Sequence, residues 1–239
     1  MRHLVSITTL ICVVAALSRC CLAQVDSKPA GHETILLEGF KVRVDTRLTT
    51  GSQADAGKQA IKRLERQLSD VVMLVPADRL VKLQTVTIQL DYTNGVLHSP
   101  QYHPSVDWLK EHGYDPRLEK CVHIPDTRYY LNVRFQREQP FAILHELAHS
   151  YHDQTLSFDN SEIRAAYERI VQNHRFDSVL HINGRMLRHY ALTDEKEFFA
   201  EMTEAYFGAN DFYPFNSAEL RRDEPEIFDL MQKVWGKLP

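Results

Sequence analysis

The residue types and the spacing of a hydrolytic metal site occur at positions 145–149, which read His-Glu-Leu-Ala-His. On an α-helix, residues four apart lie roughly 6 Å apart on one face, so His145 and His149 can both reach one metal ion. Glu146 would then point toward a water held by that metal and could accept its proton. Because the chain contains 12 histidines, a chance occurrence is the alternative, and the motif alone does not exclude it.

A catalytic zinc site needs a third protein ligand beside its water. His152 returns to nearly the same helix face as His145, but it lies about 10 Å along the helix axis. That separation is too large for metal bonds of about 2 Å unless the helix breaks first. We therefore expect His152 to contact a metal ligand without binding the metal, to lie in the cleft, or to lie in solvent at the helix end, where the helix dipole favours a histidine.

A better third ligand lies in a second predicted helix that runs to about Gly208, with Thr193 as its expected N-cap. Glu197, Glu201 and Glu204 fall on one face of this helix, opposite an apolar face. A solvated acidic face is the alternative. Three like charges at this spacing repel one another, however, and become favourable if a cation or histidine N–H groups lie opposite. Metal sites use this arrangement, with one glutamate as ligand and another that holds a ligand histidine.

The two segments together resemble the gluzincin metallopeptidases, and within them the catalytic domain of the anthrax lethal-factor type. That family joins a His-Glu-x-x-His helix to a later helix that reads Asn-Glu-x-Glu-Phe-Phe-Ala-Glu, and a tyrosine precedes the metal-binding glutamate by seven residues. In this chain residues 194–201 read Asp-Glu-Lys-Glu-Phe-Phe-Ala-Glu, and Tyr190 has the required spacing. Asp194 in place of asparagine is a departure outside the ligand set. The resemblance covers roughly residues 140–208.

The resemblance implies a role for each matching residue. His145, His149 and Glu197 would bind Zn²⁺, and Glu146 would be the general base. Glu201 would be the carboxylate that holds a ligand histidine without binding the metal. Tyr190 would donate a hydrogen bond to the developing oxyanion. The implied activity is that of a secreted zinc-dependent peptidase acting on a peptide or protein substrate. The alternatives are a zinc-containing binding or scaffold protein without turnover, and a hydrolase of another amide or ester. Glu146 argues against the scaffold, because a purely structural site needs no general base.

The start of the chain has the pattern of a cleaved signal peptide over residues 1–23. Arg2 precedes an apolar run at 4–17, and small residues favour cleavage after Ala23. The run is too short for a membrane span. A lipid anchor at Cys20 and an uncleaved anchor are the alternatives. We therefore expect a secreted or periplasmic protein, with no stable membrane insertion after cleavage.

The cysteine content and the net charge of the mature chain argue against a disulfide and against a nucleic-acid partner. Three of the four cysteines leave with the signal, so Cys121 has no partner for an intrachain disulfide and is expected to be a small buried residue. Loss of Arg2 and Arg19 takes the 28 basic residues to 26 against 32 acidic ones, a net charge of about −6. The chain shows no basic stripe, which argues against a nucleic-acid partner. The oligomeric state cannot be inferred.

The predicted elements indicate an α+β, zincin-like fold: a small N-terminal sheet with helices, the metal helix, and a C-terminal helical part around a cleft. A flexible leader is expected at 24–34 and a single catalytic domain at 35–239, ample for a packed core. Alternation predicts strands at 40–45, 86–90 and 121–124, the last as an edge strand that could pair with substrate. Helices are predicted at 54–74, 161–173 and 216–235, and an ordered loop with a short helix at 94–120. Asn183-Gly184 predicts a hairpin that delivers Tyr190 to the glutamate helix.

Overall fold

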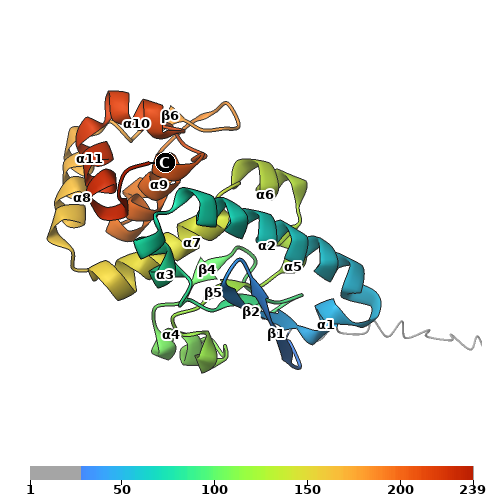
Figure 1. Cartoon of the computed structure of the whole chain (residues 1–239). Coiled ribbons are helices and arrows are strands. Elements are labelled where there is room, and N and C mark those ends of the chain that lie inside the picture. Colours follow the sequence, from blue (N-terminus) through green and yellow to red (C-terminus); the bar gives the residue numbers. More distant parts are fainter. Residues whose placement is uncertain (1–27, 239) are drawn as a thin grey trace, which may run out of the picture.

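The computed structural model describes residues 28–238, so the expected signal peptide and residues 24–27 of the expected leader lie outside the described residues. The fold is mixed α+β, as predicted: a sheet and its covering helices form one part, and the C-terminal part is helical (Figure 1). The helix α7 (Ala142–Tyr151) lies between the two parts and contacts both α2 (Ala54–Leu74) and α9 (Glu195–Phe207). Among the described residues, no helix is both long and apolar enough to span a membrane.

The N-terminal part is a mixed sheet with the strand order β1-β2-β3-β5-β4. The β1–β2 and β4–β5 pairs are antiparallel, and the two inner pairs are parallel. Its strands are β1 (His32–Leu37), β2 (Phe40–Asp45), β3 (Ile88–Leu90), β4 (Gln101–Tyr102) and β5 (Val122–Ile124). The predicted strands are present, but the leader prediction was too long, because β1 already begins at His32. Glu38 and Gly39 join β1 to β2 with positive φ at both positions, the geometry that suits the twist of a tight hairpin.

One face of the sheet is covered by α2, which the sequence predicts with the observed bounds. Its buried residues recur every three to four positions, as in Leu64, Leu68 and Val71. Gly57 lets α2 approach α1 (Thr46–Thr49) closely, since a Cβ there would lie 1.9 Å from the carbonyl oxygen of Leu48. The short connections around α2 are η1 (Gly51–Gln53) and α3 (Ala77–Leu83).

The segment 94–120 is ordered and contains a short helix, as expected, but it also supplies the edge strand β4. The prediction that 121–124 forms the sheet edge is wrong, because β5 pairs with β3 on one side and with β4 on the other. The outer strand next to the metal helix is therefore β4, which has only two residues and no alternating pattern. The short helices of this region are α4 (Val106–Glu111), η2 (Pro116–Leu118), α5 (Thr127–Tyr130) and α6 (Val133–Glu138).

The C-terminal part surrounds α9, whose buried aromatic residues share a core with Trp235. The indole N–H of Trp235 donates to Thr203 Oγ1 at 3.0 Å, which ties the closing helix to α9. The elements of this part are the π-helical turn η3 (His152–Leu156), α8 (Ser161–Asn173), the antiparallel hairpin β6 (Val179–Leu180) and β7 (Met186–Leu187), η4 (Tyr190–Leu192), α10 (Ser217–Asp223) and α11 (Pro225–Trp235). The predicted helices at 161–173 and 216–235 and the predicted hairpin are confirmed.

Two local predictions differ from the structure by small amounts. Asp194 caps α9 instead of Thr193, because its carboxylate accepts the backbone N–H groups of Lys196 and Glu197, each at 2.9 Å. Tyr190 does not lie on the hairpin strand. It begins the 3-10 turn η4, which connects the hairpin to α9.

Candidate metal centre

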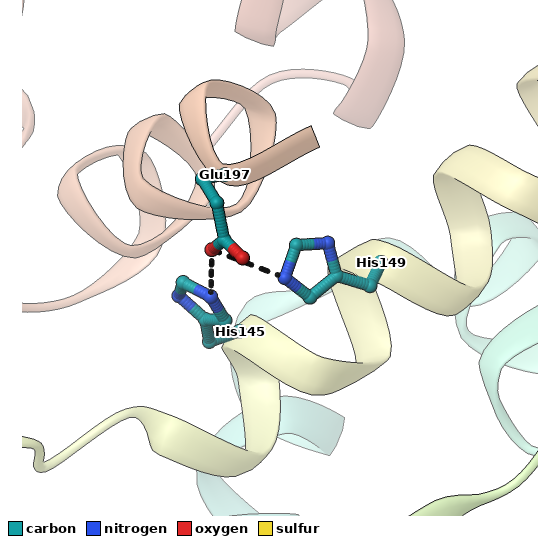
Figure 2. A group of neighbouring side chains, drawn as sticks. All are labelled: His145, His149 and Glu197. Atoms are coloured by element: carbon teal, nitrogen blue, oxygen red, sulfur yellow. Dashed lines mark hydrogen bonds and ion pairs between the residues drawn. The ribbon is translucent and has the colours of Figure 1, made fainter. Parts of the chain in front are cut away.

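Two of the predicted ligands extend from one face of α7 (Figure 2). The rings of His145 and His149 lie edge to face, with centroids 4.8 Å apart. The apolar residues of α7 are buried around them, so the helix is fixed from all sides and its two histidines have little freedom to turn away. The spacing of four residues thus produces the shared face that the sequence predicts.

The third predicted ligand extends toward the two histidines from the first turn of α9 (Figure 2). Glu197 Oε2 lies 3.1 Å from Nε2 of His145 and 3.4 Å from Nε2 of His149. One ligand atom from each of these three residues lies within 4.8 Å of the others, a grouping that could hold a metal ion. Two imidazole nitrogens and one carboxylate match the donor set of catalytic zinc, which leaves its fourth position open.

Glycine at the end of α9 allows the two ligand helices to meet. Gly208 follows the last turn of α9 and lies against the ring of Phe141, the residue just before α7. A Cβ at Gly208 would lie 2.3 Å from the nearest ring carbon of Phe141, closer than real Cβ atoms approach. The glycine that the sequence predicts as a helix stop therefore also sets the distance between α7 and α9.

A different glutamate from the predicted one holds the ligand histidine. His145 Nδ1 donates to Glu204 Oε1 at 2.7 Å, whereas Glu201 Oε1 lies 3.8 Å away, too far for a hydrogen bond. Because Nδ1 carries the proton in that bond, Nε2, which lies 3.1 Å from Glu197 Oε2, is the nitrogen that would bind a metal ion. Glu201 thus lies next to His145, as the resemblance implies, but the residue that accepts the Nδ1 proton is Glu204, one turn further along α9.

The site is strongly coupled electrostatically. Burial alone would raise the pKa of Glu197, but its contacts with both imidazoles outweigh burial and hold that pKa well below its usual value. Burial likewise opposes protonation of His145, yet its contacts with Glu197 and Glu204 raise the pKa of His145 well above the usual range. The carboxylate of Glu197 therefore faces the two histidines, whereas burial raises the pKa of Glu201 and of Glu204. The interpretation of a solvated acidic face is wrong for these two residues, which are both buried.

The predicted general base lies in the same cleft as the three possible ligands. Glu146 is 9% exposed, and its Oε2 accepts the backbone N–H of Tyr102 from the edge strand β4 at 2.7 Å. Burial raises the pKa of Glu146, which brings that carboxyl closer to neutral pH. The sequence predicts an ordered loop around Tyr102 but gives no sign of this contact.

Tyr190 also lines this cleft, whose volume is about 910 Å³. Its side chain is 47% exposed, and burial together with the negative charge of Glu197 raises its pKa to about 12. Its hydroxyl therefore remains protonated at neutral pH and available as a donor. The turn that carries Tyr190 is fixed by His189, which is buried and whose Nδ1 accepts the backbone N–H of Ala191 at 3.1 Å.

Two other residues singled out in the sequence lie away from this centre. His152 is buried between the rings of Phe158 and Phe199, with centroid distances of 5.1 and 5.0 Å, and it does not line the cleft. Neither a cleft position nor a solvated helix end is therefore correct for it. Cys121 is a free, buried thiol, as predicted.

Comparison with known proteins adds no further constraint: no family model, curated protein or solved structure matches the chain.

Proposed function

We propose that this chain is a zinc-dependent peptidase of the gluzincin type that acts outside the cytoplasm. The observation that carries the proposal is the common location of His145, His149 and Glu197 in one metal-sized cluster, with Glu146 in the same cleft. The three possible ligands and the base are the residues that the resemblance to the lethal-factor-type catalytic domain implies. The zincin-like identity of the fold belongs to this proposal, as does the signal peptide at 1–23.

A zinc ion held by the three ligands would polarise the scissile carbonyl and acidify a water molecule. Glu146 accepts the proton of the attacking water, and its raised pKa makes it a better base near neutral pH than an ordinary carboxylate. The N–H of Tyr102 holds one oxygen of Glu146, so the carboxylate keeps its orientation while it accepts the proton. Glu146 then delivers this proton to the leaving amine, which completes hydrolysis.

Tyr190 and Glu204 have supporting roles in the proposed reaction. The protonated hydroxyl of Tyr190, on the cleft wall, donates a hydrogen bond to the substrate oxygen as negative charge develops on it. Glu204 keeps the proton of His145 on Nδ1 and so fixes the ring that binds the metal.

The alternative function is a zinc-containing binding or scaffold protein without turnover. A structural zinc site would normally be closed by a fourth protein ligand. Glu146 in the cleft beside an open coordination position favours the peptidase instead.

The proposal is tested by incubating purified residues 24–239 with a mixed peptide library, with zinc and with a chelator. The peptidase proposal requires fragments that appear with zinc, disappear with the chelator, and return when zinc is restored. Stoichiometric zinc with no fragments would favour the scaffold, and iron or calcium in place of zinc would contradict the proposed metal.

A further inference from the structure

The cleft is lined by two buried carboxyl groups, each of which has one oxygen without a hydrogen-bond partner. Glu201 is 1% exposed and Asp211 is 5% exposed, and both line the cleft. Oε2 of Glu201 and Oδ1 of Asp211 are buried without a hydrogen-bond partner. Most buried polar atoms in proteins have such a partner, so each exception requires an explanation.

The histidines near Glu201 do not supply a donor. His145 Nδ1 lies 3.8 Å from Oε1 of Glu201, and its proton is directed to Glu204 at 2.7 Å. His189 Nδ1 lies 3.7 Å from Oε2 of Glu201, but it accepts the N–H of Ala191 and therefore has no proton to give. Glu201 is thus an acceptor without a donor, on the wall of a cleft that opens to solvent.

Only one of the two carboxyl oxygens of Asp211 has a hydrogen-bond partner. Its Oδ2 accepts Gln139 Nε2 at 2.6 Å and lies 3.4 Å from His181 Nε2, while its Oδ1 accepts nothing. His181 Nδ1 accepts the N–H of Asn183, so His181 keeps its proton on the nitrogen that faces Asp211. Within residues 28–238, neither Asp211 nor Glu201 forms an ion pair with a lysine or an arginine.

The arginine that lines the cleft is not a donor to either carboxyl group among the described residues. Arg134 lines the cleft, but its Nε donates to Glu138 at 2.9 Å, in an ion pair between residues one turn apart on the same helix. The backbone fixes the position of Asp211, since its carbonyl accepts the N–H of Ile182 at 2.7 Å. The aspartate therefore cannot easily turn into solvent to recover its hydration.

Burial raises the pKa of both carboxyl groups and leaves one oxygen of each without a donor, which is costly. The position of both groups on the wall of the cleft indicates that the missing donor comes from a ligand. We propose that Glu201 and Asp211 form a subsite, here called the acidic subsite, for a positively charged nitrogen of the peptide substrate. This nitrogen is either the α-ammonium group of the peptide or the side chain of a basic residue. The inference rests on the proposed peptidase function and specifies which peptides the cleft prefers.

The test measures binding without turnover. Zinc-loaded Glu146→Gln protein is immobilised and incubated with three pools of random peptides of equal length. The first pool is N-acetylated and contains lysine; the second has free N-termini and norleucine in place of lysine; the third is N-acetylated and contains norleucine. Norleucine keeps the aliphatic chain without the charge. The retained fraction of each pool is measured by mass spectrometry.

We expect the first or the second pool to be retained at least about tenfold more than the third, since a hydrogen bond to a charged group contributes roughly this factor or more. Preference for the first pool identifies a basic side chain as the ligand, and preference for the second identifies the N-terminus. Asp211→Asn, added to Glu146→Gln, should reduce this preference by most of that factor. Glu201→Gln provides a second variant if Asp211→Asn does not fold, and Asp107→Asn, an exposed aspartate on α4, is the matched control.

The other outcomes contradict the inference in distinguishable ways. Equal retention of all three pools, or a preference that survives both Asp211→Asn and Glu201→Gln, would overturn the acidic subsite but leave peptide binding intact. A second metal equivalent in the parent that is lost in Asp211→Asn would mean that a resident cation fills the site, which also overturns it. A cation preference in a protein that cleaves no peptide would retain the subsite and contradict the peptidase function.

Discussion

Substitution of Glu204 by glutamine tests how the metal site is supported. The 2.7 Å hydrogen bond from His145 Nδ1 to Glu204 ends on a carboxylate, whereas Glu201, also buried, is 3.8 Å from the same nitrogen. Glu204→Gln keeps an acceptor of the same shape but removes its charge. Glu201→Gln changes a buried carboxyl group to an amide on the same helix face and breaks no hydrogen bond of this histidine. The difference between the two variants therefore isolates the charged part of the Glu204 contact.

The size of that difference follows from general hydrogen-bond energies. A hydrogen bond to a charged group contributes about 1.5–3 kcal/mol, and one between neutral groups contributes about 0.5–1.5 kcal/mol. The loss of about 1–1.5 kcal/mol predicts a zinc Kd for Glu204→Gln that is roughly five- to tenfold weaker than that of Glu201→Gln. The two constants are measured by competition with a fluorescent zinc chelator at one fixed pH. Equal constants, or weaker binding by Glu201→Gln, would refute the assignment of Glu204 as the residue that holds His145.

Three further predictions concern the surroundings of the site. Tyr190→Phe should lower kcat by roughly a hundred- to a thousandfold with little change in KM or zinc affinity, because it removes one oxyanion donor; a parent-like kcat would remove Tyr190 from the catalytic set. Burial lowers the pKa of His152 to about 4. Below pH 6.5 the unfolded chain therefore binds more protons than the folded one, and the protein loses stability as the pH falls from 6.5 toward 4. His152→Leu should remove this loss of stability. Relative to the parent, the free energy of unfolding of the variant should be about 2 kcal/mol larger at pH 5 than at pH 7.5, as measured by denaturant unfolding. An unchanged pH dependence would contradict the prediction. Gly208→Ala should cost about 1–3 kcal/mol and weaken zinc binding, because the added methyl group overlaps the ring of Phe141; calorimetry that shows a parent-like Tm would show that the two helices can separate freely.

The parts of the fold that the sequence predicts well are those whose signals are local. The helix α2 has a regular apolar face and a proline after its end, and α8 has the same kind of face with Asn160 as its cap. The two histidines of the metal helix share a face as a direct result of helix geometry. Glu197 could be singled out because three glutamates at helical spacing repel one another unless a cation or hydrogen-bond donors lie opposite.

The choice between Glu201 and Glu204 could not be made from the sequence. The two residues are three positions apart and share one face of α9, so periodicity treats them alike. Which of them reaches His145 depends on how α9 crosses α7, and that crossing depends on contacts such as Gly208 against Phe141. A tertiary quantity of this kind leaves no pattern along the chain.

Irregular segments account for the other differences. The strand β4 has two residues, too few for an alternating pattern, yet its Tyr102 N–H orients Glu146. Asp211 follows α9 in a segment without regular structure and reaches the cleft through its backbone pairing with Ile182. His152 is buried because the chain continues past α7 in a π-helical turn, whereas the sequence allowed a place in the cleft or in solvent as well.

Zinc content and peptide hydrolysis measured together on Glu146→Gln test the central claim most directly. The substitution removes the proposed base and no ligand, so one zinc per chain should remain while the rate of hydrolysis falls by at least about a hundredfold. Glu197→Ala is the matched control, because it should lose the metal as well as the activity. Hydrolysis by Glu146→Gln at the parent rate, or a parent protein that binds no zinc, would contradict the claim that this cleft is the active site of a zinc peptidase.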